Sequence, residues 1–165
     1  MRFSLPKEAL VYYEKFNKGK WKILEDRLEF YWLCAIIGLL SSLDVGEIDS
    51  FEPNELTDKF TQRLSPSADG IRTLLFYFYY MRSNNSINEK EIMKSFDEFL
   101  TVDTLTKLSD KGTKEFNERA AIGFFIIKEN DPEPNKGYSF LLSYLSLLDE
   151  MMEEYNINEE GKGDL

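Results

Sequence analysis

The side chains that most often carry catalysis are scarce in this sequence. The chain has no histidine, which removes the commonest general base, every Ser–His or Cys–His pair and any histidine metal ligand. The one cysteine, Cys34, lies in the apolar run FYWLCAIIGLL, where a thiol stays protonated and inert. No glycine-rich segment has the spacing of a P-loop or of a dinucleotide-binding turn. These features argue against nucleophilic and nucleotide-dependent chemistry.

Carboxylates are the remaining groups that could build an acid–base or metal site. They cluster in LEDRLEF, SFDEF and LLDEMMEEY, and the residues concerned are Glu25, Asp26, Glu29, Asp97, Glu98, Asp149, Glu150, Glu153 and Glu154. None of the three clusters has the Glu-x-x-His pattern of di-iron bundles. The polar flank of an amphipathic helix explains all of them. We therefore expect no enzymatic activity, no bound metal and no cofactor.

One turn has residues that could contact a nucleic acid. In KFNKGKWK, the candidate nucleic-acid-binding residues are Lys18, Lys20, Trp21 and Lys22. Lysines neutralise phosphates, and an indole ring can stack on a base. The same residues fit a solvated turn between two helices. They also fit a contact with an acidic protein, which would act mainly on encounter rate and orientation.

The segment LLFYFYYMR, residues 74–82, is a second candidate surface. Its candidate partner-binding residues are Phe76, Tyr77, Tyr79 and Tyr80. Residues 30–40 and 74–81 carry no charge, and each aromatic side chain can bury about 150–250 Å². Either these two segments pack against each other at the centre, or one keeps an apolar surface that another subunit covers. Tyrosine suits the second arrangement, because its hydroxyl can reach water or a partner.

The elements that position these residues are expected to be helical, because apolar residues recur at helical spacing almost throughout. We predict an all-α fold, a single compact domain over residues 1–155 with a flexible acidic tail at 156–165. About six or seven helices are expected, with the apolar helices 21–43 and 66–82 at the centre and a short helix over 56–64.

Local signals place several helix ends and faces. Ser4 is expected to cap the first helix with Pro6 in its first turn, Pro53 to begin a helix, and Ser109 to cap a later one. Gly123 is expected at a close helix crossing. The inward face of the last helix is expected to consist of Leu141, Tyr144, Leu145, Leu148 and Met151.

The composition of the chain indicates how many domains it forms and in which cellular compartment it works. With 165 residues, 42 % hydrophobic residues and a net charge of −10, the chain has ample apolar content for one packed domain. Its acidity disfavours non-specific binding to phosphate backbones. A single cysteine indicates a reducing compartment, and we expect the cytoplasm. The apolar run Phe30–Leu40 is shorter than the roughly 20 residues that span a bilayer, so no membrane association is expected.

Three segments together resemble a known group of proteins. They are KLSDKGTKEFNERAAIGFFIIKENDPEPNKGYSFLLSYLSLL, FYWLCAIIGLL and GIRTLLFYFYYMR. These segments resemble small helical accessory subunits encoded beside bacterial DNA-defence genes, such as the Lamassu-type middle component and the small proteins associated with DNA phosphorothioation. The resemblance implies a non-catalytic assembly or regulatory subunit that binds a larger ATPase or nuclease of an anti-phage system. It assigns no site residue. The alternative is a nucleic-acid-binding helical module that uses the Lys/Trp turn, and an oligomer remains open.

Overall fold

The computed structural model describes residues 2–48, 50–56, 73, 89–101 and 108–160, and in these residues the fold is mostly helical. The α-helices are α1 (Lys7–Phe16), α2 (Arg27–Leu40), α5 (Glu89–Phe99), α6 (Asp110–Asn130) and α7 (Gly137–Glu160). Two 3₁₀ turns, η1 (Gly19–Trp21) and η2 (Val45–Glu47), and two strands, β1 (Ser4–Pro6) and β2 (Pro53–Glu55), accompany them. These five α-helices are fewer than the six or seven expected. The expected helices at 56–64 and, apart from Thr73, 66–82 lie outside the described residues. None of the described helices combines the length and apolar character of a membrane span.

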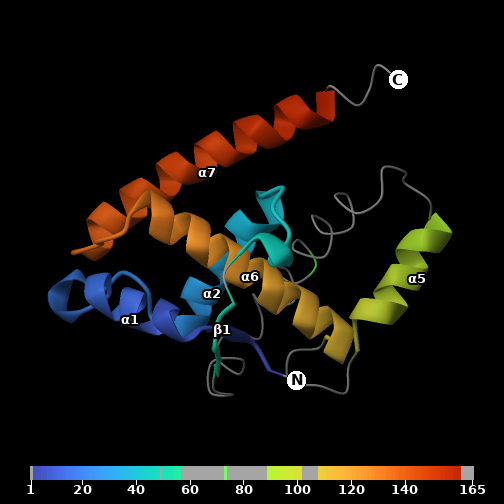
Figure 1. Cartoon of the computed structure of the whole chain (residues 1–165), viewed down its shortest axis with the longest axis horizontal. Coiled ribbons are helices and arrows are strands. Elements are labelled where there is room, and N and C mark those ends of the chain that lie inside the picture. Colours follow the sequence, from blue (N-terminus) through green and yellow to red (C-terminus); the bar gives the residue numbers. More distant parts are fainter. Residues whose placement is uncertain (1, 49, 57–72, 74–88, 102–107, 161–165) are drawn as a thin grey trace.

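Helices α2 and α6 pack closely against each other, and α6 lies between α7 and α1 in Figure 1. The two backbones touch at a pair of glycines. A Cβ on Gly38 would lie 1.7 Å from the carbonyl oxygen of Arg119, and a Cβ on Gly123 would lie 1.8 Å from that of Cys34. Neither position can hold a side chain at this separation, so the predicted close crossing at Gly123 is confirmed. The expectation that residues around 30–40 lie at the centre is also confirmed.

Helix α2 begins later than the sequence predicted. The expected helix started at Trp21, whereas that residue ends the η1 turn and α2 starts at Arg27. The carboxylate of Asp26 accepts hydrogen bonds from the backbone N–H groups of Leu28 (2.9 Å) and Glu29 (3.1 Å). Such a bond satisfies backbone donors that have no partner within the helix. Asp26 therefore caps a helix, and the Lys/Trp turn lies outside α2.

A short antiparallel strand pair replaces two of the predicted helix starts. Ser4 pairs with Glu55, Leu5 with Asn54 and Pro6 with Pro53. Helix α1 therefore begins at Lys7 and has no side-chain cap. The prediction of Ser4 as a cap and the prediction of Pro53 as a helix start are both wrong. Each strand is only three residues long, which is too short for an alternating pattern to show.

The side chain of Asn117 in α6 anchors the β1 segment. Its Oδ1 accepts hydrogen bonds from the backbone N–H of Ser4 (3.0 Å) and from the hydroxyl of Tyr31 (3.1 Å). Its Nδ2 donates to the backbone carbonyl of Arg2 (2.9 Å). One amide therefore connects β1, α2 and α6.

Aromatic side chains from four helices fill the core. Phe16 of α1 stacks on Phe140 of α7 with ring centroids 3.9 Å apart and an interplanar angle of 9°. Phe30 of α2 lies 5.7 Å from Phe16, and Phe124 of α6 lies 5.7 Å from Tyr12. Part of the aromatic content of the chain is therefore used to join α1, α2, α6 and α7.

Helix α6 begins as predicted, and α5 is attached at that end. The hydroxyl oxygen of Ser109 accepts from the N–H of Gly112 (3.0 Å), which confirms the cap. The same hydroxyl donates to the backbone carbonyl of Glu98 (2.6 Å). The backbone N–H of Ser109 donates to the backbone carbonyl of Phe99 (2.9 Å). The predicted inner face of α6 is buried: Phe116, Ala120, Gly123, Phe124 and Ile127.

Helix α7 turns the predicted residue Tyr144 inward, with Leu148 and Met151 packed against the core, but Leu145 does not belong to the buried face. Phe140, Tyr144 and Leu147 are buried, and the hydroxyl of Tyr144 donates to the carbonyl of Leu33 (3.1 Å). Leu145, which was expected to face inward, is 46 % exposed, so that assignment is wrong. Leu141, Leu148 and Met151 are only partly buried. The helix continues to Glu160, through residues that were assigned to a flexible tail.

Candidate partner-binding groove and basic turn

Helix α6 has more apolar residues than its contact with α2 uses. The run AAIGFFII occupies residues 120–127, and within it Phe125 and Ile126 are only partly buried. A hollow of about 390 Å³ lies beside them, between α6 and the segment 43–48. Its apolar lining consists of Leu43, Ile48, Ile122, Phe125 and Ile126, and its polar lining of Glu47, Lys128 and Glu129.

A second hollow, of about 450 Å³, lies between α1 and residues 50–52. Pro6, Val11 and Phe51 supply its apolar lining. The two hollows adjoin, because Phe51 of the second lies against Phe125 of the first with ring centroids 6.1 Å apart. The two hollows are together called the α6 groove. Its apolar lining consists of Pro6, Val11, Leu43, Ile48, Phe51, Ile122, Phe125 and Ile126, and its polar lining of Lys7, Glu8, Glu47, Ser50, Glu52, Lys128 and Glu129. Its apolar side chains come from α6, from Pro6 and α1, and from the chain between α2 and β2.

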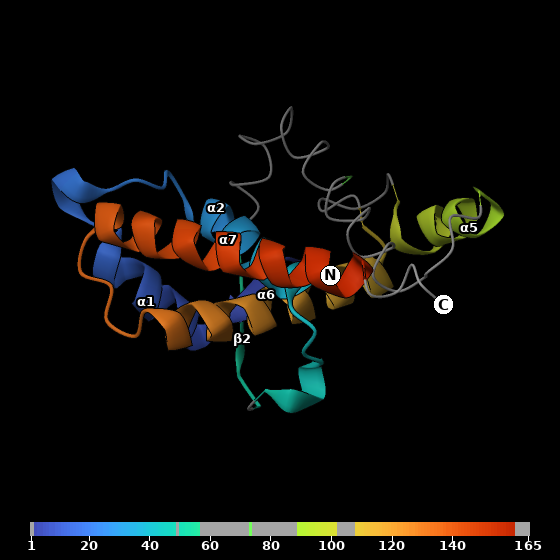
Figure 2. The same ribbon diagram turned by 90° about the horizontal axis from the view of Figure 1, so that it is seen from above.

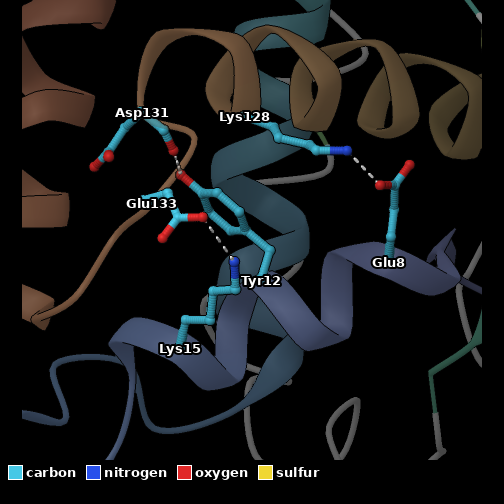
Figure 3. Close-up of polar contacts among 6 residues, drawn as sticks. All are labelled: Glu8, Tyr12, Lys15, Lys128, Asp131 and Glu133. Carbon is cyan, nitrogen blue, oxygen red and sulfur yellow. Dashed lines mark hydrogen bonds and ion pairs between the residues drawn. The ribbon is translucent and has the colours of Figure 1, made fainter.

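Polar contacts fix α1 against the C-terminal end of α6 (Figure 3). The hydroxyl of Tyr12 donates to the carbonyl of Asp131 at 2.7 Å. Burial raises the pKa of Tyr12, so this hydroxyl remains a donor even well above neutral pH. The contacts that join the two segments are Glu8–Lys128, Tyr12–Asp131 and Lys15–Glu133, the last an ion pair at 3.9 Å. They hold the wall of the α6 groove in place.

The charged groups around the α6 groove are mainly acidic. Lys128 pairs with Glu8, and Lys7 with Glu52 at 3.3 Å. Among the described residues, neither Glu47 nor Glu129 takes part in an ion pair; the carboxylate of Glu47 accepts only from the backbone of Asp44 (2.6 Å). The groove therefore combines an apolar floor with an excess of negative charge. That combination fits an apolar partner segment with basic flanks.

The predicted basic turn is held in shape by Asn17. This buried side chain accepts hydrogen bonds at Oδ1 from the N–H groups of Ile23 and Leu24, both at 2.9 Å. Its Nδ2 donates to the carbonyl of Leu24 (2.9 Å) and to the hydroxyl of Tyr13 (2.5 Å). Gly19 adopts a φ of 58°, a backbone conformation that favours glycine. The chain therefore loops around one amide before it reaches the α2 cap.

The structure adds a lysine that sequence reasoning missed. The ring of Trp21 is 48 % exposed, and two ammonium groups lie over it, that of Lys20 at 5.1 Å and that of Lys136 at 5.5 Å from its centroid. Lys136 precedes α7, and Gly137 brings it there because a Cβ at that position would lie 2.3 Å from the carbonyl oxygen of Trp21. No local pattern could place Lys136 beside a residue so distant in sequence. In the described part of the chain, Lys18, Lys20, Lys22 and Lys136 form no ion pair.

Two of the other carboxylates considered for catalysis, Glu29 and Glu98, make structural contacts, as Asp26 does. The side chain of Glu29 accepts from the N–H of Glu25 at 2.6 Å. Glu98 pairs with Lys111, and the hydrogen bond from that ammonium lowers the pKa of Glu98. Cys34 is fully buried, and burial raises the pKa of its thiol. Within the described residues, no three Asp, Glu or Cys side chains gather as a metal ion would require.

The remaining sequence candidates, Phe76, Tyr77, Tyr79 and Tyr80, lie outside the described residues. The α6 groove was not predicted, although two signals were present. The run 120–127 is apolar on more than one side, and the segment taken as a connector contains Leu43, Ile48 and Phe51. The chain matches no protein-family model, no curated protein and no solved structure.

Proposed function

We propose that this protein is a non-catalytic assembly or regulatory subunit of a bacterial anti-phage complex. It binds a larger ATPase or nuclease subunit through the α6 groove. The observation that carries the proposal is the groove itself, in which partly buried aromatic and aliphatic side chains lie beside fixed walls. The resemblance to accessory subunits of DNA-defence systems supports the class of partner. The full proposal includes a cytoplasmic, single-domain chain of six or seven helices, with Phe76, Tyr77, Tyr79 and Tyr80 as a second contact.

The chemistry of the groove defines what it can bind. Val11 and Phe51 in one hollow and Ile48 and Phe125 in the other supply apolar contacts. Aromatic and aliphatic anchors in such pockets provide most of the energy of protein–protein binding. The acidic surroundings favour a partner segment with arginine or lysine at its flanks. The partner is thus expected to present a short apolar segment between basic residues.

The test is retrieval of the partner from the native host followed by reconstitution. The tagged full-length chain should retain an ATPase or nuclease subunit, identified by mass spectrometry, and the two purified proteins should bind each other. The double variant Val11→Glu, Ile48→Glu places charge in both hollows and should weaken binding at least about a hundredfold, as expected when two apolar anchors are lost. Circular dichroism should show an unchanged fold, because neither side chain is buried.

A matched control uses Met93→Glu on α5, since Met93 is as exposed as Val11 but lies away from the groove. This variant should bind normally. If the purified ATPase or nuclease binds the groove variant and the control equally well, the groove is not the binding site. If no such subunit associates with the wild-type chain, the proposed function is wrong.

The second candidate function is nucleic-acid binding at the basic turn. The observation that favours it is the exposed indole ring of Trp21, with the ammonium groups of Lys20 and of Lys136 lying over it. Phosphates would bind the ammonium groups, and Trp21 would stack on an unpaired base. A single-stranded oligonucleotide is the appropriate ligand, because its bases are free to stack.

Fluorescence anisotropy with a labelled oligonucleotide would test this candidate. Binding should weaken steeply between low and physiological salt. Each counterion that the lysines release from the oligonucleotide steepens the fall of the logarithm of the binding constant with the logarithm of the salt concentration. Lys20→Glu and Lys136→Glu should each weaken it, and Trp21→Ala should weaken it by about one to three kcal/mol. The variant Lys94→Glu on α5 is the control for net charge. Absence of binding at low salt would remove this candidate.

A further inference from the structure

The segment between α2 and β2 forms one wall of the first hollow of the α6 groove, and Arg119 of α6 holds it there. The guanidinium of Arg119 donates to the backbone carbonyl of Leu43 at 2.7 Å and pairs with the carboxylate of Asp44 at 3.5 Å. Only 15 % of the Arg119 side chain is exposed, so its packing in the protein limits its movement. Figure 2 shows the segment that carries η2 on the side of α6 opposite to α2. The wall is therefore fixed by α6 itself.

The same segment holds the carboxylate of Glu47 in place. Glu47 Oε2 accepts from the backbone N–H of Asp44 at 2.6 Å, and the backbone N–H of Glu47 donates to the carbonyl of Asp44 at 3.0 Å. Because Arg119 holds Asp44 and Asp44 holds Glu47, this carboxylate is positioned at the first hollow before any partner binds. Such preorganisation lowers the entropy cost of binding.

Glu129 supplies a second carboxylate to the first hollow. It follows Phe125 by four residues and Ile126 by three, a spacing that places all three side chains on one face of α6. Within the described residues, neither Glu129 nor Glu47 forms an ion pair. Two negative charges without a cationic partner therefore lie beside the apolar lining of this hollow.

The second hollow has no such excess of charge. Its charged side chains are Lys7, Glu8 and Glu52. Lys7 pairs with Glu52 at 3.3 Å, and Glu8 pairs with Lys128. The uncompensated negative charge of the α6 groove is thus confined to the first hollow, whereas the second hollow suits an uncharged apolar side chain.

We propose that the first hollow binds an arginine side chain of the partner, whose guanidinium donates to the carboxylates of Glu47 and Glu129. Arginine suits this hollow better than lysine, because its planar group has five donors and can serve two acceptors from different segments. The guanidinium also lies well over aromatic rings, and the partly buried ring of Phe125 lines this hollow. The inference rests on the proposed function, since it names the residue that the α6 groove recognises.

The bound segment then has a defined direction along the groove. The two hollows adjoin at the contact between Phe51 and Phe125, whose ring centroids are 6.1 Å apart. With the arginine in the first hollow, an apolar residue near it in the partner sequence reaches the second hollow, beside Val11 and Phe51. Charge complementarity at one hollow and its absence at the other is the argument for this occupant.

Selection from a random peptide-display library on the purified full-length chain is the first test. The selected peptides should contain an arginine close to apolar residues. Selection on the double variant Glu47→Gln, Glu129→Gln should lose the arginine and keep the apolar residues. The control is Glu153→Gln, Glu154→Gln on α7, which removes the same charge from exposed positions that line neither hollow. Failure to select any peptide, lysine as frequent as arginine, or arginine retained on the double variant overturns the proposal.

Titration calorimetry with one selected peptide measures the contact. Its dissociation constant should rise at least about tenfold for Glu47→Gln, Glu129→Gln, as expected when hydrogen bonds to a charged group lose their charge. A second peptide with methionine in place of the arginine should bind this variant and the wild-type chain equally well, which a general loss of fold would not produce. Equal weakening of both peptides would show that the carboxylates do not contact the arginine. Added salt should weaken only the arginine peptide on the wild-type chain.

The purified ATPase or nuclease subunit separates this inference from the proposed function. If Val11→Glu, Ile48→Glu weakens its binding and Glu47→Gln, Glu129→Gln does not, the arginine inference is wrong and the proposed function stands. If selected peptides require both carboxylates but no such subunit associates with the chain, the arginine site is supported and the proposed function is wrong.

Discussion

Replacing Gly123 with alanine should force the two central helices apart. The added Cβ would lie 1.8 Å from the carbonyl oxygen of Cys34 and 2.6 Å from the backbone nitrogen of Gly38. Ordinary contacts begin at 3.4 Å. The obstacles are backbone atoms, which cannot rotate away as a flexible side chain could. The α2 backbone would therefore have to move by roughly 1.5 Å, enough to lose a large share of the dispersion contacts at the crossing.

The expected loss of stability is the difference between the cost of over-packing and the gain in helix propensity. Over-packing of a core typically costs about 1–3 kcal/mol, and more where the surroundings cannot relax. Alanine recovers about 1 kcal/mol of helix propensity relative to glycine. The added Cβ meets rigid backbone atoms, so its cost should lie above the typical range for over-packing. After the gain in helix propensity is subtracted, we expect a net loss of about 2–4 kcal/mol in the free energy of unfolding. This is a large part of the roughly 5–15 kcal/mol that stabilises a typical domain.

Urea denaturation followed by far-ultraviolet circular dichroism would measure this loss. With a slope of about 1–3 kcal/mol per molar urea, the midpoint for Gly123→Ala should fall by roughly 1–2 M. Gly46→Ala is the matched control, because no atom lies within 4 Å of its added Cβ. That variant should stay within about 0.5 kcal/mol of wild type. Equal stability of Gly123→Ala and the wild-type chain would refute the close crossing of α2 and α6.

Three further predictions concern single side chains. Asn17→Ala should lower the unfolding free energy by about 2–4 kcal/mol, because two backbone N–H groups lose their acceptor; Asn130→Ala, which removes an exposed amide, is the control in the same urea titration. Asp26→Ala should cost about 0.5–2 kcal/mol as the loss of a helix cap, whereas Asp26→Asn should cost less; a larger loss for the asparagine variant would speak against capping. Burial raises the pKa values of Cys34, Tyr12, Tyr31 and Tyr144, so above a pH of about 8.5 the unfolded chain loses protons that the folded chain keeps. Stability should be fully present below that pH, decline above it and decline more steeply above about pH 10; urea midpoints that do not change up to pH 11 would contradict this.

The sequence predicts those elements whose signals are local. Ser109 followed by an amphipathic segment identified the start of α6, and the spacing of Phe116, Ala120 and Phe124 identified its buried face. The close approach at Gly123 could be inferred because glycine in an apolar helix seldom has another use. In each case the signal lies within a few turns of one helix, even though the partners of Gly123 lie in α2.

The wrong or missing predictions concern residues whose position depends on a segment distant in the sequence. Leu145 was placed inside together with Tyr144 because FLLSYLSLL has leucine around most of the helix, and only the packing of α7 against α2 shows that Tyr144 is buried and Leu145 is not. The pairing of Ser4 with Glu55 depends on a register that neither strand specifies alone. Lys136 joins Trp21 through the turn that precedes α7. The α6 groove was missed for the same reason, because it forms only when residues 43–52 lie against α6.

The anchoring of β1 by Asn117 has a consequence for biosynthesis. Residues 2–6 leave the ribosome early, yet their hydrogen-bonding partners are β2 and Asn117, a side chain in the first half of α6. At about 5–20 residues per second, Asn117 follows Ser4 after an interval on the order of 6–20 seconds. Strand β2 is made within that interval, but the backbone of Arg2 and Ser4 lacks the Asn117 side chain throughout it. The β1 segment can therefore complete its native hydrogen bonds only after Asn117 has been made.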